Sequence, residues 1–174
     1  AFALLASVVV GFGAEVKPFK WSGGLNVPDP TSVTFDESGN AYVASTTRRK
    51  AGDLDIREHR LWIPDDVGLT SPADKLAFYQ RELAPGKLKA GRGSLKDHNK
   101  DGSVDWKDLT FHQERIYKLT DTDRDGVADK ITVFAEGFNS PVSGIAAGVL
   151  YFDGWVYVTA IPDVWRLKDT DGDG

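Results

Sequence analysis

The chain has 174 residues, of which 41% are hydrophobic and 27% are charged, a composition typical of a globular protein with an apolar core. It excludes a collagen-like or intrinsically disordered chain. The net charge is −5, and no basic stripe with interleaved aromatic residues is present, which argues against nucleic acid as a partner. The chain contains no Cys, so it carries neither a disulfide nor a CxxCH haem-attachment motif.

The first residues have the pattern of an export signal. Residues 1–10 are uncharged and apolar, and small residues follow at Gly11, Gly13 and Ala14, before the first charge at Glu15. The apolar stretch is too short for a membrane-spanning helix. We therefore expect residues 1–14 to be the remainder of a signal peptide and the protein to be exported, either periplasmic or extracellular and associated with the cell envelope. The alternative is a buried N-terminal strand.

The next segment predicts a pair of strands. Residues 32–36 and 41–46 alternate apolar and polar side chains around a Gly39-Asn40 turn. We assign residues 26–46 to the first strands of a propeller. Strand patterns resume later in the chain, within residues 113–174, at 115–119, 130–134, 149–152, 155–159 and 164–167.

Residues 47–112 are rich in charge and lose the alternation of strands, so we interpret them as an insertion. Ser71 is a typical helix cap and Pro72 a typical first-turn residue, which predicts a helix near 72–83. The run of three basic residues at 48–50 is typical of a solvated loop; the alternative is that it faces a central pocket.

An internal repeat is the most informative feature of the chain. Residues 116–126 match residues 164–174 position for position, at an offset of 48 residues. Short strands repeated at this period are typical of propeller blades, although a solenoid or a sandwich with a duplicated hairpin would give the same pattern.

Residues 97–108 match the twelve-residue calcium loop of an EF hand, in which oxygen atoms surround the hard Ca²⁺ ion. Gly102 permits the sharp turn, Ser103 offers its backbone carbonyl, and Val104 is expected to point into the core. His98 is expected to face solvent. The side-chain ligands predicted from the spacing are Asp97, Asn99, Asp101, Asp105 and Asp108.

Two further loops have the same beginning. The second is flanked by strands, so we expect it to bind calcium as a structural staple on a hairpin rather than as a catalytic centre. Its predicted ligands are Asp121, Asp123, Asp125, the carbonyl of Val127, and Asp129. The third shows Asp169, Asp171 and Asp173 before the sequence ends, so we expect the chain to be a truncated piece of a longer protein.

The three loops hold 11 of the 26 acidic residues. Two bound Ca²⁺ ions would bring the net charge from −5 to −1, and three would bring it to +1. The alternative interpretation is an Asx-rich turn without metal. Three such runs, two of them in phase with the repeat, favour calcium.

Taken together, these features resemble the N-terminal propeller of large exported proteins described as membrane-bound dehydrogenases or PVC-type haem-binding proteins. The resemblance covers roughly residues 26–174, and the last sixty or so residues are the most specific. The matching segments are 30–36, 39–43, 115–119, 121–126, 134–139, 143–149 and 161–174. We therefore predict an all-β fold, an incomplete β-propeller of about two blades with a charged, partly helical insertion and EF-hand-like calcium loops.

The resemblance implies a propeller similar to those of quinoprotein glucose and sorbosone dehydrogenases. Such a protein would oxidise a sugar or an alcohol with PQQ and pass electrons to a c-type haem in a downstream region. No residue of this chain matches a quinone ligand or a catalytic base, and the two blades alone are not expected to be active. The alternatives are a non-catalytic propeller that binds glycans or proteins, and a calcium-stapled adhesion module.

Overall fold

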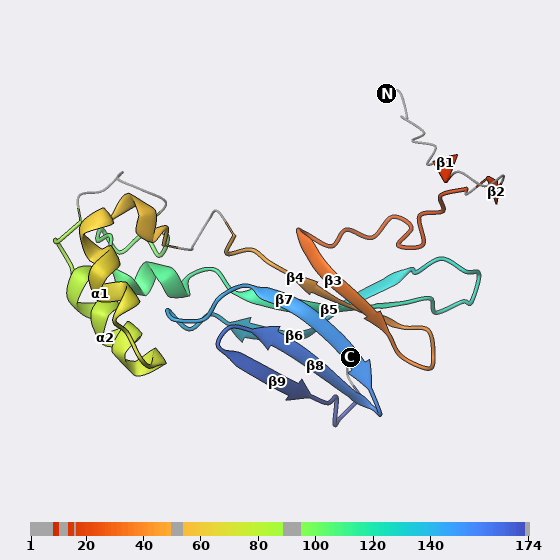
Figure 1. Cartoon of the computed structure of the whole chain (residues 1–174). Helices are drawn as coiled ribbons and strands as arrows, with labels where there is room; N and C mark the ends of the chain where they lie inside the picture. Colours follow the sequence, from red (N-terminus) through yellow and green to blue (C-terminus); the bar gives the residue numbers. More distant parts are fainter. Residues whose placement is uncertain (1–8, 11–13, 16, 50–53, 89–94, 173–174) are drawn as a thin grey trace.

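A computed structural model describes residues 9–10, 14–15, 17–49, 54–88 and 95–172. It shows an all-β body with a small helical lobe at one end (Figure 1). The strands are β1 (Val9–Val10), β2 (Ala14–Glu15), β3 (Pro30–Phe35), β4 (Ala41–Ser45), β5 (Glu114–Thr120), β6 (Lys130–Phe138), β7 (Ala146–Phe152), β8 (Trp155–Ala160) and β9 (Asp163–Leu167).

The strands of the body form two antiparallel sheets in which each strand pairs with the next along the chain. The first sheet has the order β3-β4-β5-β6 and the second has the order β7-β8-β9. Val43 on β4 pairs with Val33 on β3 and with Tyr117 on β5. The 48-residue repeat therefore coincides with the third strand of each sheet, β5 in one and β9 in the other.

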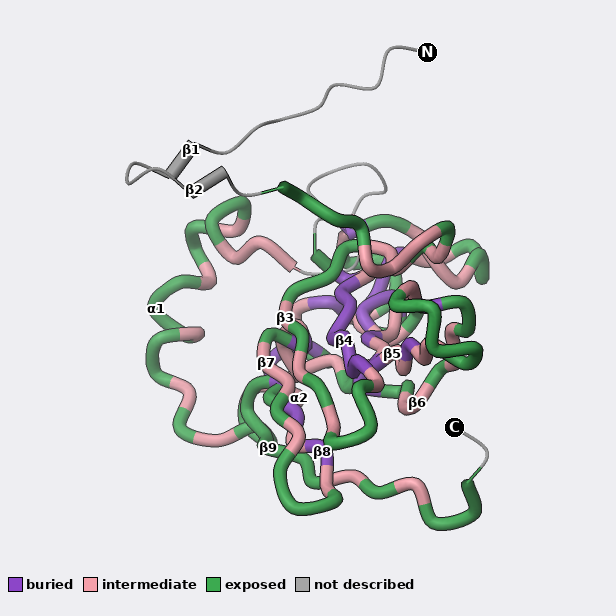
Figure 2. The backbone as a smooth tube through the Cα atoms, turned by 90° about the vertical axis from the view of Figure 1, so that its right-hand side faces the viewer, coloured by how far each residue is buried: buried purple, intermediate pink, exposed green. Residues whose placement is uncertain are grey.

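The two sheets pack face to face around a shared core, to which β4, β5 and β8 contribute buried residues (Figure 2). Hydrogen bonds join β3 to β7 directly: the Thr31 hydroxyl donates to the Ala146 carbonyl at 2.7 Å, and the Tyr151 amide donates to Thr34 Oγ1 at 3.1 Å. The buried members of this core are Tyr42, Ala44, Ile116, Phe138, Ala146, Val156, Val158 and Ala160.

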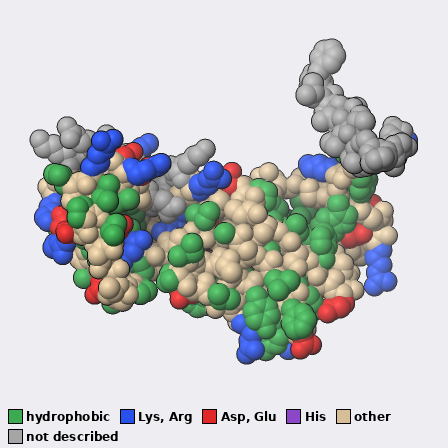
Figure 3. Space-filling model, viewed as in Figure 1, with side chains coloured by type: hydrophobic (Ala, Val, Ile, Leu, Met, Phe, Trp, Pro, Cys, Tyr) green, Lys and Arg blue, Asp and Glu red, His purple; other side chains and the backbone are tan. Residues whose placement is uncertain are grey.

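The outer faces of the two sheets differ in how far they are covered. On the first sheet, Trp21, Leu25 and Val27 pack against a second small core. The outer face of the second sheet is more open, and hydrophobic side chains gather over this sheet at the lower edge of Figure 3. Leu150 and Val164, for example, are 57% and 71% exposed.

The insertion between β4 and β5 forms the helical lobe and has a core of its own. Ser71 caps α2 by accepting a hydrogen bond from the Asp74 amide at 3.1 Å. Val104 is buried in this core, as predicted. The helical elements are η1 (Ile56–Glu58), η2 (Arg60–Trp62), α1 (Ile63–Val67), α2 (Pro72–Glu82) and η3 (Trp106–Thr110).

Some element boundaries differ from the sequence predictions. Strand β6 continues to Phe138, four residues beyond the predicted end at 134, because two register shifts let β5 and β6 stay paired past that point. Strand β7 begins at Ala146, three residues before the predicted start at 149. The short helical turns of η1, η2 and α1 were not predicted, since they lie where charge and Pro64 obscure any periodicity.

Most of the predicted signal segment lies outside the described residues, and β1 and β2 form a two-stranded antiparallel pair within and beside it. Export stays a prediction. In the part of the chain that the structure describes, no helix is both long enough and apolar enough to cross a membrane.

Candidate metal centre

The loop between β5 and β6 brings three predicted calcium ligands together. Oxygen atoms of Asp121, Asp123 and Asp125 lie within 4.8 Å of one another. Across the described ranges, this is the one group of three or more acidic or histidine residues whose ligand atoms converge in this way. The loop lies at the end of the sheets opposite the helical lobe (Figure 1).

Backbone amides turn these carboxylates toward a common point. The Gly126 amide donates to Asp121 Oδ2 at 2.9 Å, and the Asp125 amide donates to Asp123 Oδ1 at 3.2 Å. The turn requires left-handed backbone at Arg124 (φ 61°) and at Gly126 (φ 94°). Glycine adopts this conformation without the steric cost that a side chain imposes, which explains the glycine at the sixth position of the loop.

The remaining oxygen of Asp121 fits a metal ligand. Asp121 Oδ1 is shielded from solvent and has no hydrogen-bond partner. A carboxylate oxygen in that position loses its hydration without compensation. A hard cation bound between the three carboxylates would supply the missing interaction and offset their mutual repulsion, so the residues present fit calcium.

Asp129, predicted to close this site, makes different contacts. Its two carboxylate oxygens accept hydrogen bonds from the Thr122 amide and the Thr122 hydroxyl. The hydroxyl bond, followed by the amide bond, lowers the pKa of Asp129. Val127, predicted to offer its carbonyl, packs its side chain against Gly23, where an added Cβ would lie 2.7 Å from Val127 Cγ1.

The loop at 97–108 has the same spacing, and its first three predicted ligands accept backbone hydrogen bonds in the same pattern as those of the second loop. Asp97 accepts from the amides of Asp101 (3.2 Å) and Gly102 (3.0 Å). Asn99 Oδ1 accepts from the Asp101 amide at 2.9 Å, and Asp101 Oδ1 accepts from the Ser103 amide at 2.9 Å. These are Asx turns of the kind that can form without metal.

The last two predicted ligands of that loop are buried and bonded. Asp105 caps η3, accepting from the Lys107 amide at 2.8 Å. Asp108 is fully buried and accepts three backbone hydrogen bonds, from the amides of His98, Asn99 and Asp105. Both carboxylates therefore already hold the loop and the following helical turn in place.

The prediction that His98 faces solvent was wrong. His98 is half-buried, and its Nδ1 lies 3.2 Å from His112 Nε2. Burial, followed by the neighbouring His98 and Arg48, lowers the pKa of His112. No sequence pattern indicates this pair, because His98 and His112 come together through the packing of Phe111 against both rings.

The third loop follows β9, as the second follows β5. The Gly172 amide donates to Asp169 Oδ1 at 2.7 Å, and Asp171 is exposed. Asp169 and Asp171 line a cavity of about 230 Å³ beside Phe134 and Lys168. Asp173, the last predicted ligand, lies outside the described residues.

Comparison with known proteins places the chain in one family. Residues 24–174 match the model of a family described as a domain of unknown function, DUF7133, and the chain belongs to that family. No curated protein and no solved structure matches the chain.

Proposed function

We propose that the loop between β5 and β6 binds Ca²⁺ through Asp121, Asp123 and Asp125 and thereby staples the hairpin. The observation that carries this proposal is the convergence of the three carboxylates within 4.8 Å, with Asp121 Oδ1 buried and unpartnered. Calcium takes six to eight oxygen ligands, so waters and backbone carbonyls would complete the shell. Extracellular modules bind calcium at about 10⁻⁴ to 10⁻³ M, which suits the predicted export.

The proposed role is structural. The three carboxylates sit on a hairpin loop at the surface, where Asp123 and Asp125 are exposed. Bound calcium would stabilise the folded state by about 2.7 kcal/mol at a free concentration one hundred times the dissociation constant.

The loops at 97–108 and 169–174 are proposed as further calcium sites. The loop at 97–108 is expected to bind more weakly, since Asp108 is already bonded to three amides.

Titration calorimetry of the intact protein with CaCl₂ tests the main site. Asp121→Ala combined with Asp123→Ala removes one calcium per chain in the expected result. Asp65→Ala combined with Asp66→Ala removes the same charge from the exposed helix α1 and leaves the stoichiometry unchanged. An unchanged stoichiometry in the Asp121/Asp123 variant contradicts the assignment.

We further propose that the two sheets are consecutive blades of a β-propeller. The support is the in-order pairing of each sheet, the packing of first strand β3 against first strand β7, and the repeat that coincides with the third strands. Blades of a propeller are four-stranded sheets arranged around a common axis, and β3-β4-β5-β6 has that size. A low-resolution solution envelope of the intact protein tests this proposal: a disc with a central channel is expected, and an elongated rod contradicts it.

By resemblance, the whole protein is proposed to oxidise a sugar or an alcohol with bound PQQ and to pass electrons to a downstream c-type haem. Dye reduction by the intact protein, supplied with PQQ and calcium, tests this activity across sugars and alcohols. Activity that depends on PQQ supports the proposal. Absence of activity together with saturable binding of glycans or a protein favours the non-catalytic alternative.

A further inference from the structure

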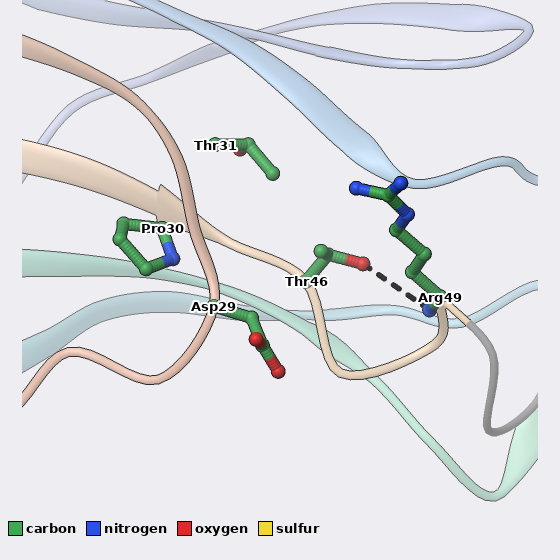
Figure 4. A pocket seen from close by; sticks show the side chains of 5 residues that line it. All are labelled: Asp29, Pro30, Thr31, Thr46 and Arg49. Carbon is green, nitrogen blue, oxygen red and sulfur yellow. Dashed lines mark hydrogen bonds between the residues drawn. The ribbon is translucent and has the colours of Figure 1, made fainter.

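A polar cavity of about 240 Å³ lies where β3 begins and β4 ends (Figure 4). The proposed calcium loop follows β5 at the other end of this sheet. The position of the cavity follows from the topology: the segment before β3 and the segment after β4 leave the first sheet at the same end and form its walls. The residues that line it are Asp29, Pro30, Thr31, Thr46 and Arg49.

Thr46 ties the walls of this cavity together. Its amide donates to the Asp29 carbonyl at 3.2 Å, which holds the segment before β3. Its Oγ1 accepts a hydrogen bond from the Arg49 amide at 3.4 Å (Figure 4) and donates one to Glu114 Oε1 at 3.0 Å. Thr46 is 3% exposed, so these bonds are protected from water.

Glu114 is the buried anchor beneath the cavity. It is fully buried, and its Oε1 also accepts from the amides of Thr47 and Arg48, while its Oε2 accepts from the Ala146 amide at 2.8 Å. One carboxylate thus joins the chain leaving β4 to the first residue of β7. Hydrogen bonds to an ionised carboxylate are among the stronger hydrogen bonds in proteins. The wall of the cavity is therefore held in one conformation before any ligand binds.

Asp29 is held in a costly backbone conformation at the rim. It lies between two prolines with φ at 40°, in the left-handed region that costs a non-glycine residue of order 1–3 kcal/mol. The Ser45 hydroxyl donates to the Pro28 carbonyl, and this bond and the bond from Thr46 fix the turn. Strain retained by such surrounding bonds is concentrated at binding and active sites.

The two charged groups of the cavity are available to a ligand. Asp29 and Arg49 are both exposed, and neither forms an ion pair with any described residue. In Figure 4 their side chains leave the wall on different sides of Thr46. A guanidinium binds a carboxylate in a planar, two-bond arrangement, and a carboxylate accepts hydrogen bonds from hydroxyls. None of the five lining residues is aromatic, so a neutral sugar would find no stacking surface here.

We propose that this cavity binds a small hydroxylated carboxylate, a sugar acid of the uronate or aldonate class. Arg49 receives the ligand's carboxylate, and Asp29 accepts hydrogen bonds from its hydroxyls. Thr31 Oγ1, which already donates to the Ala146 carbonyl, offers its lone pairs to a further hydroxyl. The proposal is independent of calcium binding, because no lining residue belongs to any of the three acidic loops.

Titration of the intact protein with glucuronate, glucuronate methyl ester and glucose tests the proposal. Saturable binding of glucuronate is expected, and the ester and glucose should bind at least about tenfold more weakly, because they lack the charge that pairs with the guanidinium. Arg49→Gln should weaken glucuronate binding by at least about tenfold, and Asp29→Asn by a smaller factor. Arg60→Gln removes an exposed arginine of the helical lobe and should leave the affinity unchanged.

Each variant is first checked for a wild-type thermal transition, so that a loss of binding cannot reflect unfolding. Equal affinity for glucuronate and glucose, retained affinity in Arg49→Gln, or no saturable binding by the folded wild-type protein would each overturn the proposal. The titration is repeated after calcium chelation at a temperature where the protein stays folded. Binding that survives chelation separates this site from the calcium proposal.

Discussion

The loops at 97–108 and 121–129 begin with Asp or Asn at the same three positions and share a backbone path. At the fourth position, Lys100 and Arg124 have φ values of 60° and 61°, and at the sixth position, Gly102 and Gly126 have values of 88° and 94°. The carboxylates nevertheless differ in burial and in whether they converge. In the first loop the last two are buried under a helical turn, and in the second three converge at the surface of a hairpin.

The difference shows that the spacing determines the turn, whereas the surroundings determine whether its oxygens remain available. In the helical lobe, Val104 and Leu109 are buried in the local core, which brings Asp105 and Asp108 inside with them. In the hairpin the loop lies beyond the end of the paired strands β5 and β6, and Asp123 and Asp125 are exposed. We therefore expect the first loop to depend on its hydrogen bonds and the second to depend on calcium.

The largest expected effect is on the buried carboxylate of the first loop. Asp108→Ala leaves three amides without an acceptor and should reduce the free energy of unfolding by about 3 kcal/mol, with or without calcium. Urea denaturation of the intact protein in calcium and in chelator measures this loss. For comparison, Asp125→Ala removes an exposed carboxylate of the second loop and should cost less than about 0.5 kcal/mol in chelator. Equal losses of unfolding free energy for the two variants in chelator would contradict the proposed difference between the loops.

A smaller effect, equal in both loops, is expected at the glycines. Gly102→Ala and Gly126→Ala each force a Cβ into the left-handed region and should each cost roughly 1–2 kcal/mol. No atom lies within 4 Å of a Cβ added at either position, so the cost comes from the backbone alone. Thermal melts compare the two variants, with Gly24→Ala as the control, because Gly24 is equally open and has no positive φ. Unequal costs would contradict the shared backbone path.

The smallest expected effect concerns the pH dependence of Asp129. Its pKa is lowered from 3.8 by the Thr122 hydrogen bonds, so it contributes stability above pH 3.8 that is lost as the pH falls through the lower folded-state value. Thr122→Val removes the hydroxyl donor and should move the Asp129 pKa upward, as measured by NMR titration of its carboxyl group. Thr122→Ser keeps a hydroxyl and should keep the pKa low. An unchanged pKa in Thr122→Val would show that the hydroxyl contact is not the cause.

Many strands of the all-β body could be predicted, because the patterns that indicate them involve residues close together in the sequence. Alternation around the Gly39-Asn40 turn gave β3 and β4, and Ser71 followed by Pro72 gave the beginning of α2 within one residue. The repeat located β5 and β9, since a shared strand-and-loop sequence requires only neighbouring residues.

The features that were missed depend on contacts between distant residues. In the sequence, Glu114 is an ordinary charged residue just before the strand predicted at 115–119. In the structure it is fully buried, because the amides of Ala146 and Arg48, 32 and 66 residues away along the chain, both donate to its carboxylate. The burial of Asp108 likewise follows from the packing of α2 and η3 within the helical lobe. Spacing alone identified the acidic residues as candidates. It could not distinguish the loop whose last two carboxylates are buried from the loop whose first three carboxylates converge at the surface.

Amide hydrogen exchange of the intact protein, resolved at Gly102 and Gly126, tests this central distinction most directly. Both amides donate to the first Asp of their loop, at 3.0 and 2.9 Å, so each reports on the closed form of its own turn. Removing calcium should raise the exchange rate of Gly126 strongly and that of Gly102 only slightly. Equal acceleration at both amides, or acceleration at Gly102 alone, would contradict the account.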